Sequence, residues 1–310
     1  MHLIFGICWL LIIYSHMKYL SSIDVAKIMG CNDSTIRRWA DKGIINCKKT
    51  PGGNRFFTIE DIRECIKKNH SNTKTSSLGI KGNSLKRIYK LTNDLNYKEL
   101  SKIILDKSIQ SDDLIVSEII NSLYIKGINV EDIFDKLILK SIYLIEELLI
   151  SKKITHVQEY IARQMLTKCI QTLNINKPNG SYNGKSILCI NFEDNVPDIG
   201  VVMSEVVLRH YGYNVYNAGS HAELGNIEKT LDLYKIDSIL FYLCDLQCCN
   251  SIIKDNIIKT ENQIKQICSL AAKNELNIYL GGEGLEFIKF KENNFINSFK
   301  SFTDLSHLLK

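Results

Sequence analysis

The sequence lacks paired cysteines and any recognisable catalytic constellation, and each absence excludes a class of protein. Its ten cysteines are scattered, with neither a CxxC pair nor the spacing of a secreted disulfide scaffold, which predicts reduced thiols and a cytoplasmic location. The cluster Cys244, Cys248 and Cys249 leaves a thiol switch or soft-metal site open, but no His or CxxC spacing accompanies it and we expect no metal. No Ser-His-Asp, Cys-His, P-loop or zinc-hydrolase pattern occurs, so we expect no enzyme.

The sequence also lacks an opening apolar run long enough to span a bilayer. Leu3–Tyr14 is too short for a transmembrane helix, and it has neither the basic flank nor the small-residue cleavage site of a signal peptide. We therefore expect no membrane partner. Residues 1–16 precede Met17, where the first structural pattern begins, and we interpret them as a disordered extension or as the product of an upstream start.

A strong overall charge is absent as well, but the charge that is present is unevenly placed. The 310 residues carry a formal net charge of +5. Between Lys18 and His70 there are eleven Lys or Arg against six Asp or Glu, so this segment accounts for the whole excess. At this length, with 45% hydrophobic residues, two or three globular domains are expected. A basic first domain on a neutral body is typical of a polyanion-binding module.

Residues 19–62 contain two short amphipathic helices separated by a tight turn. The first helix is predicted to bury one apolar side, formed by Ile23, Val25, Ala26, Ile28 and Met29. Gly30-Cys31 breaks it where the turn must form. Asn32-Asp33-Ser34 then offers N-cap oxygens for the second helix.

The second helix has one apolar side and one basic side. Its spacing predicts that Ile36, Trp39 and Ala40 are buried. Arg37 and Arg38 point elsewhere on the same helix. Two helices joined this tightly present the second one to a groove.

A basic hairpin is predicted after the second helix. Ile44-Ile45 is expected to begin its first strand, Phe56-Phe57 lies in its second strand, and Pro51-Gly52-Gly53 forms its tip. Its tip and flanks carry Lys48, Lys49 and Arg55, so the hairpin could lie against phosphates or enter a minor groove.

A third helix is predicted to follow the hairpin. It spans Ile59–Lys68, with Thr58 as its cap and Asp61 in its first turn.

The run STIRRWADKGIINCKKTPGGNRFF, residues 34–57, resembles the winged helix-turn-helix of MerR-type regulators, and its TPGGxR wing is closest to the small excisionase-like branch. Helix, turn, Gly43, wing and Arg55 match in order, whereas Asn54 replaces the usual His. The resemblance covers residues 19–66. It implies that the Ser34–Asp41 helix enters the major groove of double-stranded DNA while the wing lies on the flanking backbone.

Seven residues are the resulting candidates for DNA contact. They are Ser34, Thr35, Arg37, Arg38, Lys48, Lys49 and Arg55. For Arg37 and Arg55 we favour a phosphate or base-edge contact. Ser34 and Thr35 could instead cap the helix, and Arg38 could be a solvated surface charge.

The remainder divides into a tether, a helical bundle and a doubly wound parallel α/β sheet. We expect residues 17–70 to be the DNA-binding domain, 71–84 a polar linker, 85–175 the all-α bundle and 176–310 the Rossmann-like domain. Strands are predicted at Ser186–Ile190, Asn214–Tyr216, Ser238–Leu243 and Asn277–Leu280, and helices at Ile199–Tyr211, Ile227–Tyr234 and Ser251–Ala272. The loops at the carboxyl ends of these strands form the expected ligand edge.

A bundle followed by this sheet resembles the cobalamin-binding module of corrinoid methyltransferases and of light-responsive, cobalamin-dependent MerR-type repressors. The resemblance implies a pocket formed by Glu159, Asp198, Gly200, Cys244, Leu246, Gly281 and Gly282. In the family, a His in a loop of the form Asp-x-His-x-x-Gly replaces the lower ligand of cobalt. Asn195 and Pro197 stand where that Asp and His belong, and proline cannot coordinate a metal. We therefore expect no cofactor, although the resemblance leaves cobalamin open.

The sequence thus predicts a cytoplasmic, MerR-type transcriptional regulator that binds DNA as a dimer or higher oligomer. Its C-terminal part would be a sensory or assembly module that has lost cobalamin ligation. Alternatives are a regulator that still binds a corrinoid without the His ligand, a corrinoid-carrying methyl-transfer subunit, or a non-catalytic protein-interaction module.

Overall fold

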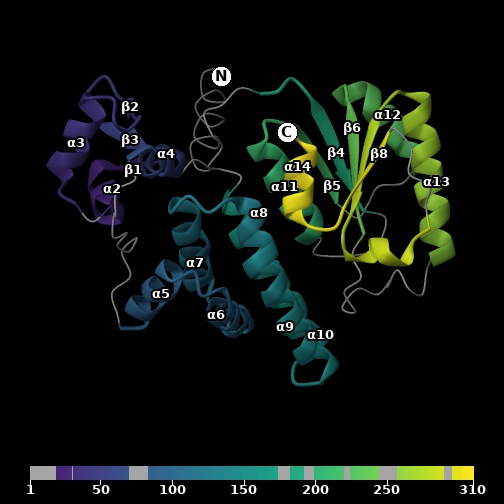
Figure 1. Ribbon diagram of the computed structural model, residues 1–310, viewed down its shortest axis with the longest axis horizontal. Helices are drawn as coiled ribbons and strands as arrows, with labels where there is room; N and C mark the ends of the chain where they lie inside the picture. Colours follow the sequence, from purple (N-terminus) through teal and green to yellow (C-terminus); the bar gives the residue numbers. More distant parts are fainter. Residues whose placement is uncertain are drawn as a thin grey trace, which may run out of the picture. The chain divides into compact units, whose positions relative to one another are not determined.

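The computed structural model places the described residues in two compact units (Figure 1). The described residues of the first unit fall within 1–96, 117–129 and 172–179, and those of the second fall within 97–116, 130–171 and 180–310. Within these limits the structure describes residues 19–29, 31–69, 83–173, 182–191, 199–219, 224–243, 257–289 and 295–310. None of the helices in these ranges is long and apolar enough to cross a membrane.

Residues 19–69 of the first unit form three helices and a small antiparallel sheet, called the N-terminal domain below. The helices are α2 (Ser22–Met29), α3 (Asp33–Asp41) and α4 (Ile59–Asn69), and the strands are β1 (Leu20–Ser21), β2 (Lys48–Lys49) and β3 (Arg55–Phe57). The strand order is β1-β3-β2. Its core includes the buried Val25, Ile36, Ile45, Phe57 and Ile62. The predicted winged helix-turn-helix is confirmed.

Two details predicted for the first two helices are wrong. Ile23 is 52% exposed, because Val25, Ala26 and Met29 share the buried face of α2 and Ile23 lies on the other side. The predicted side-chain cap of α3 is absent, since its N-cap Asn32 makes no side-chain cap hydrogen bond.

The predicted strand at Ile44-Ile45 is also wrong. The backbone N–H of Ile44 donates to the carbonyl of Trp39 at 2.9 Å, so this segment closes the end of α3. The strand begins only at Lys48. Ile45 is nevertheless buried in the core. The apolar pair therefore indicated a buried position, and a strand was predicted from it because short apolar runs are also typical of strands.

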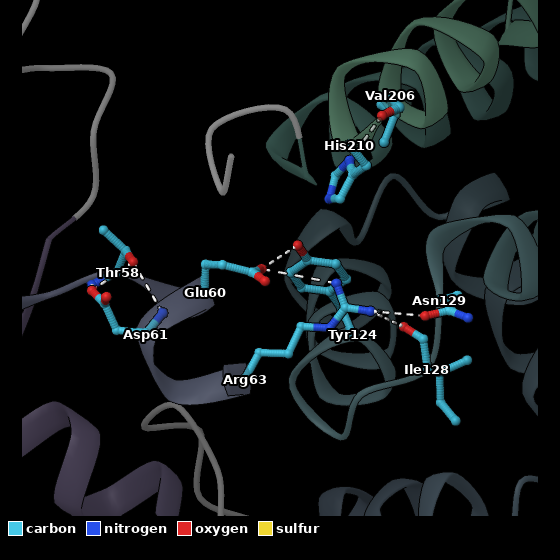
Figure 2. Close-up of polar contacts among 9 residues, drawn as sticks. All are labelled: Thr58, Glu60, Asp61, Arg63, Tyr124, Ile128, Asn129, Val206 and His210. Carbon is cyan, nitrogen blue, oxygen red and sulfur yellow. Dashed lines mark hydrogen bonds and ion pairs between the residues drawn. The ribbon is translucent and has the colours of Figure 1, made fainter. Parts of the chain in front are cut away.

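The predicted start of the third helix is confirmed. The Asp61 carboxylate accepts hydrogen bonds from the Thr58 backbone N–H at 2.8 Å and from its hydroxyl at 2.7 Å. The Asp61 N–H donates back to the Thr58 hydroxyl at 3.1 Å (Figure 2). This reciprocal cap satisfies backbone donors that have no partner inside the helix.

The predicted extension 1–16 and most of the predicted tether 71–84 lie outside the described residues. The last two tether residues already belong to α5 (Asn83–Asn93). The first unit also contains Ser117–Asn129, which includes the C-terminal part of α7 (Asp113–Ile125). Tyr89 of α5 donates its hydroxyl to Glu118 of α7 at 2.5 Å.

The helical region predicted between the linker and the sheet is confirmed. Its further helices are α6 (Tyr97–Ile109), α8 (Val130–Ile133), the π-helix η1 (Phe134–Ile138), α9 (Leu139–Ile150) and α10 (His156–Gln171). In the second unit α6, α9 and α10 pack against one another. The predicted break at Ser151 falls directly after α9, and the one at Gly127 falls two residues beyond the end of α7.

The second unit also contains the predicted parallel sheet. Its strands are β4 (Ser186–Ile190), β5 (Asn214–Gly219), β6 (Ser238–Tyr242), β7 (Asn277–Gly281) and β8 (Ile296–Phe299). All neighbouring pairs are parallel, in the order β5-β4-β6-β7-β8. The order reverses at β4, which is the doubly wound arrangement.

Helices cover both faces of this sheet (Figure 1). They are α11 (Ile199–His210), α12 (Leu224–Tyr234), α13 (Ile257–Lys273), the 3-10 helix η4 (Glu283–Phe287) and α14 (Phe302–Leu308). α11 contacts α14, whereas α12 contacts α13. Ile239 and Phe241 of β6 face the α12–α13 layer, within the core cluster that includes Ile227 and Ile264.

Candidate functional site

Helix α3 presents the residues predicted to enter a DNA groove. Ile36 is completely buried, so the helix is fixed by its inner side. Ser34, Arg37 and Arg38 are exposed, and Thr35 is half-buried. Arg37 pairs with Asp33 one turn earlier at 2.7 Å, and 54% of its side chain is exposed. A surface pair of this kind exchanges readily for a phosphate or a base edge.

The wing is the hairpin of β2 and β3. The backbone N–H of Thr50 donates to the carbonyl of Asn54 at 2.9 Å, and Gly53 supplies the positive φ of 80° that closes the turn. Lys48 and Lys49 are exposed, whereas Arg55 is half-buried. The predicted hairpin tip is confirmed.

Asp41, the last residue of α3, holds two of the wing cations. Its carboxylate accepts hydrogen bonds from one Arg55 Nη at 2.8 and 3.0 Å and from Lys49 Nζ at 3.0 Å. The hydrogen bond from Arg55, followed by that from Lys49, lowers the pKa of Asp41 below its ordinary value. Asp41 was missed from the sequence, although a carboxylate ending a basic helix beside a basic hairpin was the available signal.

Lys48 has a different partner from its neighbour Lys49. Its Nζ donates to the hydroxyl of Tyr19 at 3.1 Å and lies 5.4 Å from the centre of that ring. The Tyr19 ring in turn meets Phe56 edge-on, with centroids 6.2 Å apart. This aromatic support positions the Lys48 ammonium on the exposed side of β2.

These cations belong to one small domain, and they match the two parts of a groove-binding module. Arg37 and Arg38 lie on the exposed side of α3, where base edges can be read. Lys48, Lys49 and Arg55 lie on the wing, where phosphates can be bound. The structure therefore places all seven predicted candidates on α3 or the wing.

The second site predicted from the sequence is the edge of the parallel sheet. A Cβ added to Gly200 at the start of α11 would come within 2.2 Å of the Tyr242 ring. At Gly281 it would come within 2.3 Å of the Phe299 ring, and at Gly282 within 2.2 Å of the Leu243 carbonyl oxygen. The space that these glycines leave open is therefore filled by the protein itself.

Tyr242 is held firmly in this position. Its ring stacks on Phe302 with centroids 5.9 Å apart and planes 9° from parallel. Its hydroxyl donates to Glu283 at 3.1 Å, and Tyr143 donates to the other oxygen of the same carboxylate at 3.2 Å. Only 3% of Tyr242 is exposed.

Glu159 is the one other predicted pocket residue that lies within the described ranges. Glu159 is buried and its carboxylate is paired with Arg163 at 2.7 Å. Asp198, Cys244 and Leu246 lie outside the described residues, as do the loop with Pro197 and the three clustered cysteines. In the part of the chain that is described, no three His, Cys, Asp or Glu side chains converge on a possible metal position.

Two histidines of the second unit lie in ordinary surroundings. His156 is exposed at the start of α10. His210 places Nδ1 2.8 Å from the Val206 carbonyl oxygen of its own helix (Figure 2). At the sheet edge the described glycine positions lie against Tyr242, Phe299 and Leu243.

The fold and the basic surface together define a winged helix-turn-helix domain joined to a helical region and a doubly wound sheet. Residues 20–65 match the family described as MerR HTH family regulatory protein, so the predicted MerR-type DNA-binding domain is confirmed. No curated protein matches this chain.

Solved structures are similar to the helical region and sheet. A monomethylamine corrinoid protein from Methanosarcina barkeri aligns over 68% of this chain and 97% of its own, with 11% identity and a TM-score of 0.51. The predicted cobalamin-binding-like fold is therefore confirmed as a fold. A methanol:cobalamin methyltransferase complex from Methanosarcina barkeri aligns at 14% identity with a TM-score of 0.30, covering 68% of this chain and 78% of its own. A cobalamin-binding protein from Desulfitobacterium hafniense DCB-2 aligns at 11% identity with a TM-score of 0.28, covering 67% and 96%.

Proposed function

We propose that this protein is a cytoplasmic, sequence-specific transcriptional regulator without enzymatic activity. The observation that carries the proposal is the MerR-type domain with Arg37 and Arg38 exposed on α3 and Lys48 exposed on the wing. Helix α3 enters the major groove and reads base edges, while the wing lies on the flanking phosphates. Affinity falls steeply as salt rises, because the bound cations displace counterions from DNA.

Asp41 has a defined part in this mechanism. In the free protein its carboxylate occupies the positions on Arg55 and Lys49 that a DNA phosphate would take. Binding of the wing to DNA exchanges one anion for the other. Asp41 therefore keeps the wing cations ordered and weakens their attraction to DNA of any sequence.

The protein acts as a dimer or higher oligomer in this proposal. One domain of this size buries little surface on DNA, so useful affinity needs two or more of them joined through the C-terminal part. Sedimentation of the purified protein, alone and with operator DNA, tests this point. A protein that is a monomer at micromolar concentration and binds its operator tightly as a single copy would contradict it.

The sheet module serves as an assembly or sensory part in which cobalamin ligation is lost. Pro197 at the family's ligand position and Tyr242 against Gly200 support this proposal. The test is to incubate the purified protein with hydroxocobalamin, remove free ligand by gel filtration and record the absorption spectrum. Protein free of corrinoid absorbance is expected, and a co-eluting chromophore would overturn the expectation that the module binds no corrinoid.

A corrinoid-binding regulator is the second candidate, favoured by the similarity of the fold to a corrinoid protein. A corrinoid held without a protein ligand would give the same co-eluting chromophore. A methyl-transfer subunit is less favoured because the DNA-binding domain has no use in that reaction.

A further inference from the structure

The N-terminal domain is joined to a second segment of the same unit by a buried tyrosine. Tyr124, in the last turn of α7, is completely buried, and its hydroxyl donates to the Glu60 carboxylate of α4 at 2.6 Å (Figure 2). The adjacent Ile125 belongs to the same buried cluster as the core of the N-terminal domain. The domain's core therefore includes a residue from α7.

Arg63 completes this cluster from one turn further along α4. Its guanidinium lies over the Tyr124 ring, 4.2 Å from the centroid, and 3.8 Å from the Glu60 carboxylate. One Nη donates to the carbonyl of Ile128 at 3.1 Å and to the side-chain oxygen of Asn129 at 3.3 Å. The segment of residues 124–129 is therefore bonded to α4 at both of its ends.

Burial makes these contacts mutually dependent. Glu60 and Arg63 are 7% and 5% exposed, so neither is well solvated by water. A buried charge that loses its partner is far less stable than a paired one. Burial, followed by the charge of Glu60, raises the pKa of Tyr124, which keeps its hydroxyl protonated and donating. The buried Glu60 and Arg63 of α4 are therefore stable only while residues 124–129 remain packed against them.

The contact does not compete with DNA. Glu60 and Arg63 lie on α4, whereas the candidate DNA contacts lie on α3 and the wing. A contact that leaves the DNA-binding surface exposed cannot act as a simple block. It can, however, hold the DNA-binding surface in one orientation relative to residues 117–129.

We infer that Tyr124 is a positioning residue for DNA recognition: through Glu60 and Arg63 it fixes the N-terminal domain to residues 117–129. In an oligomer this removes the freedom of each N-terminal domain to turn on residues 117–129, which restricts the separations open to two α3 helices, so the protein discriminates between operators by the spacing of their half-sites. The inference rests on the proposed function, because spacing matters only if two domains bind one DNA. It goes beyond that function by naming the residues that set the spacing.

The first arm of the test needs no DNA. Full-length wild type, Tyr124→Ala and Tyr124→Phe are compared by hydrogen exchange of the α4 amides, with Tyr89→Phe as a matched control. Tyr89→Phe removes a hydroxyl bonded to Glu118, a bond of the same type within the same unit that does not involve α4. Exchange in α4 is expected to rise about tenfold or more in both Tyr124 variants, with the larger change in Tyr124→Ala, and to stay unchanged in Tyr89→Phe.

The second arm measures binding to paired half-sites separated by one helical turn, about 10.5 base pairs, and by about one and a half turns. Wild type is expected to prefer one spacing, and Tyr124→Ala to bind a single half-site within about twofold of wild type while losing the preference. Unchanged α4 exchange in Tyr124→Phe, a spacing preference retained by Tyr124→Ala, or a wild type indifferent to spacing would each overturn the inference. A wild type that binds no DNA would refute the proposed function and with it the positioning role, whereas the exchange arm would still report on the α4 contact.

Discussion

The carboxylate of Asp41 accepts two hydrogen bonds from Arg55, at 2.8 and 3.0 Å. This pair links the last residue of α3 to the second strand of the wing. The two candidate DNA-binding elements are therefore attached to each other before DNA is present. Only 21% of the Arg55 side chain is exposed, so Arg55 is a structural residue as well as a candidate contact.

Replacing Asp41 with Asn should strengthen binding to random-sequence DNA. The amide removes one negative charge and weakens the hold on Arg55 and Lys49, which then become available to about one or two further phosphates. Affinity for random DNA at low salt should rise about threefold or more. The slope of the logarithm of affinity against the logarithm of salt concentration should become steeper by about one or two. Fluorescence anisotropy over a salt series measures both.

Asp106→Asn on α6 makes the same charge change at an exposed position that lies outside the N-terminal domain. It should leave both quantities at the wild-type values. An equal rise in the two variants would mean that net charge alone explains the effect, and the part assigned to Asp41 would be lost.

Replacing Arg37 with Ala should weaken operator binding about tenfold or more, because one good contact to a base or phosphate contributes about 1–3 kcal/mol. The fold should be unaffected, since the side chain is exposed and has only a surface pair with Asp33. Gel shifts give the affinity and thermal unfolding checks the fold. Lys102→Ala, which removes a similarly exposed cation on α6, serves as the control and should bind as wild type does.

The contribution of Lys126 to the stability of the fold should rise with pH. Burial lowers the pKa of this ammonium to about 8, against about 10.5 in the unfolded chain. Between these two values the unfolded state binds more protons than the folded state, so the free energy of unfolding contributed by this group rises with pH. The gain is complete above about pH 10.5 and absent below about pH 8.

Urea unfolding of wild type and Lys126→Gln at several pH values between 7.5 and 10.5 isolates this contribution as the difference between the two proteins. The difference should shift in favour of wild type as pH rises. Lys102→Gln, which alters an exposed lysine instead, should follow wild type throughout. A Lys126→Gln protein whose stability tracks wild type at every pH would contradict the assignment.

Gly200→Ala should destabilise the sheet module, because the added methyl group overlaps the Tyr242 ring. Overpacking of this kind typically costs about 1–3 kcal/mol. The cost should largely disappear in a Tyr242→Ala background, where the ring is gone. Gly225→Ala is the control, since an added Cβ there meets nothing within 4 Å. Denaturant unfolding of the four combinations gives the coupling, and an additive result would mean that Tyr242 does not fill the glycine's space.

Periodicity in the sequence was sufficient to predict the helix-turn-helix, the bundle helices and four strands of the sheet, since each buries a regular apolar face. It missed β8 and α14. β8 has only four residues, and its two polar residues are adjacent between Ile296 and Phe299, so it shows no alternation. The start of α14 does carry a readable capping box, in which Ser301 accepts from the Asp304 N–H.

The candidate site was predictable only in part, for a physical reason. The cations of α3 and the wing follow from local spacing, so Arg37 and Lys48 were found. Asp41 and Tyr124 act through partners distant in the sequence, Arg55 and Glu60, and local periodicity carries no information about such pairs. The role of Gly200 was likewise invisible until the Tyr242 ring was located beside it.

The central claim, that α3 reads DNA, is tested most directly by selection of bound sequences from a random duplex library with full-length wild type and Arg37→Ala in parallel. The account predicts that wild type enriches a defined motif and that Arg37→Ala enriches either no motif or one with relaxed preference at the positions that Arg37 contacts. Failure of wild type to enrich any motif, or recovery of the same motif at the same strength by Arg37→Ala, would contradict it.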